Sequence, residues 1–319
     1  IMFVDSHHNE FSSEPVIVIG DPEGNFIPPQ FIAMDQPKHD VQRAAVTPAV
    51  APAQLSKWED LIRVRIQELL DDLPVGVPFN WVEDVSIELT GRMLATLFGI
   101  PQEDRRKLTE WSDVATASPA VGTTGVSQEV REETLRECLA YFTDVWNQRI
   151  NEPPSMDFIS LLAHSPDTRN MDSLEYLGNL ILLIVGGNDT TRNSMSGSVY
   201  ALNKFPEQFQ KLKDDHSLIT NMVSETIRWQ TPLSHMRRIA TQDVELGGKT
   251  IKKGDKVVMW YVSGNRDDEV ISNPNDFIID RKRARHHLSF GFGIHRCMGN
   301  RLGEMQLRIL WEELLTRFS

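Results

Sequence analysis

Residues 289–303 read SFGFGIHRCMGNRLG and hold a single cysteine, Cys297, with glycines on both sides of it. Apolar residues at helical spacing from Arg301 to Phe318 predict a helix soon after this cysteine. Free backbone N–H groups and the helix dipole at a helix start favour a thiolate. Glycine has no Cβ, so the backbone can lie close against a flat or bulky group at Gly291, Gly293 and Gly299. The stretch therefore predicts a functional thiolate.

A thiolate of this kind serves either as a nucleophile or as a metal ligand. Nucleophilic hydrolysis needs a positioned base, and His295 lies only two residues away in a tight loop. No second cysteine or nearby HxxxH pattern completes a zinc site. An axial thiolate ligand of haem iron needs no further protein ligand and fits these residues best. The other cysteine, Cys138, lies in an amphipathic helical pattern and is interpreted as a buried apolar residue.

The 319 residues carry a net charge of −12 and have an ordinary globular composition. This charge argues against nucleic acid or an anionic membrane as the main partner, because both would repel it. Apolar runs such as Leu180–Val185 are far shorter than the roughly 20 residues that span a bilayer. Two cysteines exclude a disulfide framework. We therefore expect a soluble protein with a cytoplasmic location.

Apolar periodicity predicts a mostly helical chain from about residue 36 to residue 230 and again over 297–318. The clearest helical segments are Leu55–Leu70, Trp81–Phe98, Leu135–Ile150 and Leu174–Val185. The proline-rich beginning, up to about Gln36, predicts loops. The segment VELGGKTIKKGDKVVMWY (244–261) predicts a small antiparallel sheet at about 238–262. We expect one mainly α domain over residues 1–319 with a minor antiparallel sheet.

The stretch FGFGIHRCMG (290–299) resembles the cysteine-ligand loop of the cytochrome P450 superfamily. The family pattern is Phe, two residues, Gly, one residue, His or Arg, one residue, Cys, one residue, Gly, and every position is filled. The resemblance implies the P450 fold, with haem b bound through Cys297 and with Phe290 and Gly291 beside the haem. It also implies that the chain lacks the family's N-terminal helix and strands and its C-terminal strands.

Haem carries two propionates, and a buried carboxylate needs a cation or donors. His39 and Arg43 are spaced i, i+4 and would lie on one helix face. They match the family's propionate-binding His-x-x-x-Arg, and Arg238 and His295 match its other two propionate contacts. Taken singly, each pair is better interpreted as solvated surface charge. Their occurrence together, in family order, favours the haem site.

Glu225 and Arg228 in SETIRW (224–229) form an i, i+3 pair that would by itself be an ordinary helix salt bridge. In the resembling family, this pair is buried and is joined by an arginine from a later segment. Arg281 in FIIDR (277–281) is the best match for that third member, with Arg283 close by.

The segment IVGGNDTTRNS (184–194) places two glycines in a helical pattern, where each costs about 1 kcal/mol relative to alanine. One interpretation ends a helix at Gly186–Gly187 and starts another at Asn188 or Asp189. The other continues the helix and leaves room at the glycines for O₂ and substrate above the haem. The resemblance favours the second interpretation. It implies that Asp189 and Thr190 are the acid and alcohol pair that delivers protons.

The reaction implied is insertion of one oxygen atom of O₂ into an unactivated C–H bond. The electrons would come from a ferredoxin and its NAD(P)H-linked reductase. The basic run RKRAR (281–285), together with Arg296, predicts a docking face for such a partner, although a solvated charge run is as good an interpretation. The family resemblance favours a monomer.

Four stretches, 31–43, 182–195, 232–240 and 287–299, resemble the soluble bacterial subfamily that hydroxylates the terminal carbon of medium-chain alkanes. By correspondence, an apolar pocket would be lined by Phe31, Ile32, Leu182, Val185, Gly186, Leu233 and Met236, with Gly187 beside the haem. The alternatives are a fatty-acid hydroxylase or peroxygenase, a non-catalytic haem-thiolate binding protein, and a cysteine hydrolase built on Cys297 and His295. Asp189 and Thr190 argue against a peroxygenase, whose relatives carry arginine and proline there.

Overall fold

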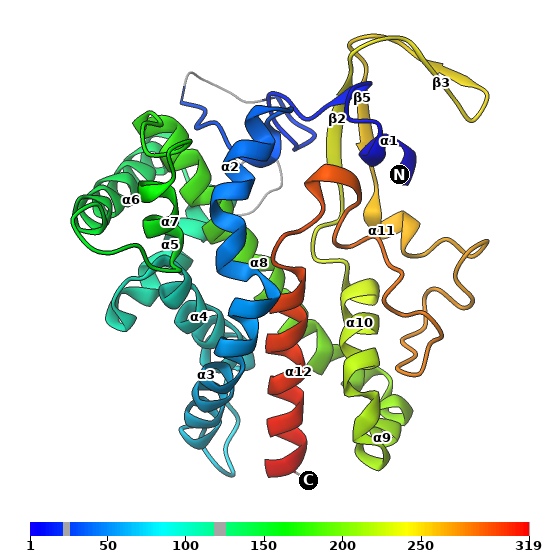
Figure 1. Cartoon of the computed structure of the whole chain (residues 1–319). Helices are drawn as coiled ribbons and strands as arrows, with labels where there is room; N and C mark the ends of the chain where they lie inside the picture. Colours follow the sequence, from blue (N-terminus) through cyan, green and yellow to red (C-terminus); the bar gives the residue numbers. More distant parts are fainter. Residues whose placement is uncertain (22–25, 118–125, 319) are drawn as a thin grey trace. The chain divides into compact units, whose positions relative to one another are not determined.

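The computed structural model describes residues 1–21, 26–117 and 126–318 (Figure 1). The chain divides into two compact units. Unit 1 comprises Ile1–Asp21, Lys57–Ser86 and Thr190–Ser319, and unit 2 comprises Pro22–Ser56 and Ile87–Asp189. Helices α3 (Pro52–Asp71) and α8 (Ser173–Lys204) each cross a boundary between these stretches.

Within its described residues, unit 2 consists of helices joined by loops, without a strand. Its elements are η1 (Phe31–Ala33), α2 (Lys38–Val46), η2 (Thr47–Val50), α4 (Glu88–Phe98), η4 (Gln102–Asp104), α5 (Arg105–Thr116), α6 (Gln128–Arg149) and α7 (Phe158–His164). Local sequence explains several ends, because the Ser127 and Asp157 side chains accept N-terminal N–H groups of α6 and α7, and Gly99 ends α4 at φ 67°. α4 packs on α5, α5 on α6 and α6 on α7, around the rings of Phe98, Phe142 and Trp111.

The helices of unit 1 are mostly C-terminal. They are α1 (Met2–Ser6), the π-helical turn η3 (Val82–Ile87, ending at the unit boundary), α9 (Pro206–Asp214), η6 (His216–Leu218), α10 (Ile219–Gln230), α11 (Tyr261–Gly264), η7 (Gly293–His295) and α12 (Asn300–Arg317). α10 and α12 lie side by side (Figure 1). Charged pairs tie α3 to α12, with Arg63 bonded to both Glu312 and Glu313 at 2.6 Å.

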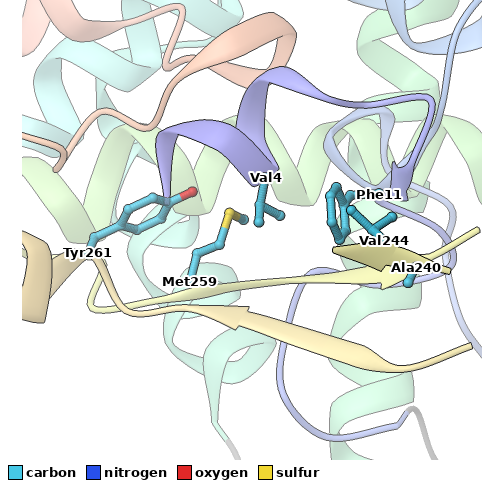
Figure 2. Close-up of a cluster of buried hydrophobic side chains, with 6 residues drawn as sticks. All are labelled: Val4, Phe11, Ala240, Val244, Met259 and Tyr261. Carbon is cyan, nitrogen blue, oxygen red and sulfur yellow. The ribbon is translucent and has the colours of Figure 1, made fainter. Parts of the chain in front are cut away.

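The strands of unit 1 form two small antiparallel sheets. β2 (Met236–Ala240) lies between β1 (Phe11–Ser12) and β5 (Lys256–Met259), in registers that pair Phe11 with Ala240 and Met236 with Met259. β3 (Val244–Leu246) and β4 (Lys249–Ile251) form a separate hairpin. Figure 2 shows Val4 of α1 and Phe11 of β1 meeting Ala240, Val244, Met259 and Tyr261 in a buried apolar cluster between α1 and the strands.

The expected mainly helical architecture with a minor antiparallel sheet is confirmed. The predicted loop-rich beginning, up to about Gln36, also holds α1 and β1, which the sequence did not indicate. Both are too short to show a periodic pattern, and β1 exists only because it pairs with β2. Within the described ranges, no helix combines the length and apolarity needed to cross a lipid bilayer.

Candidate functional site

The cysteine loop is a compact turn within unit 1. Cys297 is exposed, between η7 and the first residue of α12 at Asn300. Its N–H donates to the carbonyl of Phe290 at 2.8 Å, which closes the loop. Gly291 and Gly293 adopt left-handed φ values of 66° and 67°, where residues with a Cβ are strained. The loop thereby presents its thiol from a fixed backbone.

The structure gives a second reason for one of these glycines. A Cβ at Gly293 would lie 2.1 Å from the carbonyl oxygen of Asp5, whereas a Cβ at Gly299 would meet no atom within 4 Å. The sequence predicted that the glycine backbone lies close against a flat or bulky group. At Gly293, this neighbour is Asp5, in the N-terminal segment of the same chain. At Gly299, no neighbouring atom of the chain requires the absence of a Cβ.

Asn265 anchors the start of the cysteine loop. It is fully buried, and its side-chain amide donates to Ser289 Oγ at 2.8 Å and to Thr231 Oγ1 at 3.0 Å. Its carbonyl oxygen accepts the N–H of Leu288 at 2.7 Å. The sequence contained no signal for this residue, because its partners lie more than twenty residues away on either side.

Two of the predicted propionate contacts lie in unit 1 with Cys297. Arg238, in β2, is 2% exposed and forms an ion pair with Asp5 at 3.2 Å. His295, in η7, is also buried, and its Nε2 forms a 2.8 Å hydrogen bond with the hydroxyl of Ser13. Both side chains are therefore held by residues of the N-terminal segment, Asp5 and Ser13.

The other two predicted propionate contacts, His39 and Arg43, lie on α2 of unit 2. His39 is buried, its Nδ1 lies 2.7 Å from Asp40 Oδ1, and Arg43 is half-buried. Burial lowers the pKa of His39, and the bond to Asp40 partly opposes this effect. Asn179 of α8 donates to Gln42 of α2 at 2.7 Å, so the two helices are fixed to each other within this unit.

Helix α8 runs unbroken through Gly186 and Gly187, so the interpretation that ends a helix there is wrong. A Cβ at Gly187 would lie 2.6 Å from Leu94 Cδ2, which explains one glycine by packing. Asp189 Oδ2 accepts the hydroxyl of fully buried Ser112 at 3.2 Å. Thr190 is the next residue of the same helix and is half-buried. Ser112 is a functional candidate that the sequence did not reveal.

The predicted substrate residues divide between the units. In unit 2, Phe31 is buried and its N–H donates to Asn179 Oδ1 at 3.0 Å, which holds η1 on α8. Ile32, Leu182 and Val185 are half-buried, and Gly186 is exposed. In unit 1, Leu233 follows α10 and Met236 begins β2, and both are half-buried.

Glu225 is the centre of a buried charge cluster in unit 1. It accepts two hydrogen bonds of 2.8 Å from Arg228, and Arg281 Nε donates to its oxygens at 3.0 and 3.1 Å. Arg228 also donates to the carbonyls of Asn265 and Pro274, both at 2.8 Å. Removing one partner from a buried cluster of this kind costs about 3–5 kcal/mol, because a charge is left unpaired. The cluster fixes α10 to the segment that precedes the cysteine loop.

The position of Arg281 corrects the expectation that all of RKRAR forms a docking face. The Arg281 side chain is only 9% exposed because it serves the Glu225 cluster. Arg285 is exposed and forms an ion pair with Glu304 at 2.6 Å. Lys282, Arg283 and Arg296 are the other exposed cations of the predicted face.

The donor set around Cys297 fits haem b. Among the described residues, no three His, Cys, Asp or Glu side chains gather to hold a metal ion by themselves. A metal at Cys297 must therefore bring further ligands, as the nitrogens of a porphyrin do. An exposed thiol on a fixed loop suits an axial ligand, and the buried donors Arg238 and His295 of the same unit suit carboxylates.

Comparison with known proteins agrees with this chemistry. Residues 123–319 match the sequence profile of the family described as cytochrome P450. The solved structure of cytochrome P450-153 from Novosphingobium aromaticivorans is 49% identical, with a TM-score of 0.91 over 99% of this chain and 80% of that chain. Linalool 8-monooxygenase of Pseudomonas putida is 37% identical over 290 residues, 90% of this chain and 70% of that protein.

A methyl-branched lipid omega-hydroxylase of Mycobacterium bovis is 32% identical over an alignment of 325 positions, which covers 98% of this chain and 74% of that protein. The family profile, these relatives and the cysteine loop all agree. The chain belongs to the cytochrome P450 family and is a haem b monooxygenase.

Proposed function

We propose that this cytochrome P450 hydroxylates the terminal carbon of medium-chain n-alkanes, or of related hydrophobic chains, to primary alcohols. The observation that carries the proposal is the apolar character of the substrate-side residues of unit 2. Ile32, Leu182 and Val185 are apolar and half-buried, and Gly186, which follows Val185 in α8, is exposed. A hydrocarbon without polar handles requires such a lining. The similarity to cytochrome P450-153 and to an omega-hydroxylase supports the choice of substrate class.

In this proposal, Cys297 ligates the haem iron, and Phe290 and Gly291 lie beside the haem. Arg238, His295, His39 and Arg43 hold the propionates. When bound, the haem supplies O₂ activation, which its thiolate ligand promotes by favouring O–O cleavage. The Glu225 cluster has a structural role, since it fixes the segment that leads into the cysteine loop.

Asp189 and Thr190 carry the proton chemistry of the proposal. The Ser112 hydroxyl donates to Asp189 Oδ2, which holds the carboxylate at one side of α8. From that position, Asp189 relays protons and the Thr190 hydroxyl orients the group that receives them. Gly186, on the preceding turn, leaves open space, since a Cβ there would meet no atom of the chain within 4 Å.

Attack on a terminal carbon requires a narrow channel, because internal C–H bonds are weaker and would otherwise react first. Phe31 and Ile32 from η1, with Leu182 and Val185 from α8, supply one apolar wall within unit 2. The bond from Phe31 N–H to Asn179 holds η1 on α8, the helix that carries Leu182 and Val185. Leu233 and Met236 are the proposed contributions of unit 1.

We also propose a ferredoxin and its NAD(P)H-linked reductase as electron donors, and a monomer in the cytoplasm as the working form. The docking face comprises Lys282, Arg283, Arg285 and Arg296, which are exposed on an otherwise acidic chain. Complementary charge would raise the rate of encounter with an acidic partner.

The first test is the difference spectrum of reduced protein with CO, recorded beside Cys297→Ala. A strongly red-shifted Soret band that is lost in Cys297→Ala supports thiolate ligation. An unshifted band in folded, haem-loaded protein removes Cys297 as the iron ligand.

The second test is turnover of octane with ferredoxin, reductase and NADH, with product analysis by gas chromatography. We expect 1-octanol as the main product. Internal octanols alone would contradict terminal attack, and turnover of fatty acid but not octane would favour the fatty-acid hydroxylase. Turnover with peroxide alone would favour a peroxygenase, and haem and CO binding without any product would favour a binding protein.

A further inference from the structure

Helix α1 carries a buried carboxylate to which the proposed function gives no role. Asp5 is 2% exposed. Its Oδ1 accepts a hydrogen bond from Arg238 Nη2 at 3.2 Å, and its Oδ2 accepts from the Tyr261 hydroxyl and from the N–H of Phe292, both at 3.1 Å. These donors belong to β2, to α11 and to the cysteine loop. One carboxylate thus joins three segments of unit 1.

The backbone at Asp5 also touches the cysteine loop. The carbonyl oxygen of Asp5 lies where a Cβ of residue 293 would be, 2.1 Å from that position, so only glycine permits the contact. A Cβ at Gly291 would lie 3.8 Å from Asp5 Oδ2. The cysteine loop is therefore packed against α1 at the residues on both sides of Phe292. The N–H of Phe292 itself donates to Asp5.

The three contacts suit the ionised form of Asp5. An ionised carboxylate is only an acceptor, and Arg238, Tyr261 and the Phe292 N–H all act as donors to it. Burial raises the pKa of Asp5, while these three neighbours act in the opposite direction. Asp5 also balances the charge of Arg238, which is itself 2% exposed.

Arg238 keeps donors for another anion while it is bound to Asp5. Its Nη2 donates to Asp5 and its Nη1 donates to the carbonyl of Arg237 at 2.9 Å. These bonds use two of the five N–H hydrogens of a guanidinium. Arg238 therefore retains N–H donors that its bond to Asp5 does not use.

We propose that Asp5 is a positioning residue that fixes the cysteine loop and Arg238 relative to each other. It thereby sets the spacing between the iron ligand and a propionate-binding guanidinium. This inference rests on the roles given above to Cys297 and Arg238. Asp5 acts through those residues and does not itself touch the haem.

The same helix offers a matched control. Val4 precedes Asp5, is 3% exposed and packs into the apolar cluster with Phe11, Met259 and Tyr261 (Figure 2). Val4→Ala loosens α1 but keeps every polar contact of Asp5. Asp5→Asn keeps the size of the side chain but removes its charge and one acceptor oxygen.

The experiment compares wild type, Asp5→Asn and Val4→Ala as holoproteins at equal haem loading. Three quantities are measured: the rate of haem transfer to apomyoglobin, the share of red-shifted Soret band in the reduced CO complex, and hydrogen exchange of peptides covering 288–299. For Asp5→Asn we expect haem loss about 10- to 100-fold faster, a reduced share of red-shifted band, and faster exchange at Phe292. Val4→Ala should lower the unfolding midpoint and leave all three quantities close to wild type.

Equal behaviour of Asp5→Asn and Val4→Ala in all three measurements would overturn the proposal, because Asp5 would then be only a structural residue of α1. If Asp5→Asn does not fold, Tyr261→Phe replaces it, since that change removes one of the three bonds and keeps the ring in the cluster. A smaller shift in the same direction supports the proposal, and no shift rejects it. An unshifted band already in wild type, together with faster exchange at Phe292 in Asp5→Asn, would leave the positioning role standing and reject the thiolate assignment of Cys297.

Discussion

At the scale of single residues, the chemistry of this protein depends on side chains whose partners lie far away in sequence. Asp189 follows two glycines in α8, and its hydrogen-bond donor, Ser112, lies 77 positions earlier in α5. Asp5 and Arg238 are separated by 233 positions. The sequence shows that these positions carry an acid or a cation. Only the folded chain shows which neighbour holds each of these side chains in place.

The role of Asp189 gives the first prediction at this scale. Asp189→Asn should lower octane hydroxylation about a hundredfold, because an amide retains an oxygen that can accept the Ser112 hydroxyl but cannot relay a proton. The CO spectrum should remain that of wild type. Product formed per NADH consumed is the measurement.

Ser112→Ala is the companion variant. It keeps the acid and removes the donor that holds it, so we expect a loss of about tenfold or less, with uncoupled NADH consumption. Wild-type turnover by Asp189→Asn would rule out Asp189 as the proton-delivering acid.

At the scale of elements, α8 is the helix on which unit 2 arranges its candidate substrate residues. Its glycines have different causes. A Cβ at Gly178 would lie 1.9 Å from the carbonyl oxygen of Pro29, one at Gly187 would press on Leu94, and one at Gly186 would meet no atom of the chain within 4 Å. Of these three, only Gly178 faces a backbone atom, which cannot move aside as the end of the Leu94 side chain can.

This contrast predicts different outcomes for two alanine variants of α8. Gly178→Ala should destabilise the protein by about 1–3 kcal/mol and raise KM for octane, because the backbone before Phe31 must move away from the helix. Gly186→Ala should gain about 0.5–1 kcal/mol of helix stability, since nothing in the chain opposes the new Cβ. Urea unfolding and KM for octane are the measurements. Equal stability of the two variants would show that the segment before η1 is not held closely on α8.

At the scale of the whole molecule, stability should depend on pH through His287. Burial lowers the pKa of His287 from 6.5 to about 4, and Arg296, Arg228 and Arg285 act in the same direction. His287 takes up a proton near pH 6.5 in the unfolded chain but only near pH 4 in the folded chain. The stability contributed by neutral His287 is therefore complete above pH 6.5 and is lost as pH falls from about 6.5 to about 4.

The measurement is the free energy of unfolding in urea at pH 7 and pH 5, for wild type and for His287→Gln. Wild type should lose about 2 kcal/mol more than the variant over this interval. An equal loss in both proteins would mean that His287 is accessible to protons in the folded state.

The sequence by itself determined the family and the inventory of chemical groups. The cysteine loop at 290–299 is specific because a thiolate, a turn and a helix start must follow one another in the chain, and such local requirements are written in consecutive residues. Long helices such as α6 and α8 were predictable for the same reason, since their apolar periodicity extends over many turns. The Glu225–Arg228 pair was likewise visible as an i, i+3 spacing.

The tertiary structure alone decided which residues support those groups. α1 and β1 are too short to carry a pattern, yet they bring Asp5 to Arg238 and Ser13 to His295. The resemblance offered Arg281 both for the Glu225 cluster and for the docking face, and the structure places it in the cluster. Buried polar atoms must find partners wherever the fold brings them, and those partners need not be neighbours in sequence. A sequence motif shows which residues must be adjacent along the chain. Burial, and hydrogen bonds between residues far apart in sequence, arise only when the chain folds.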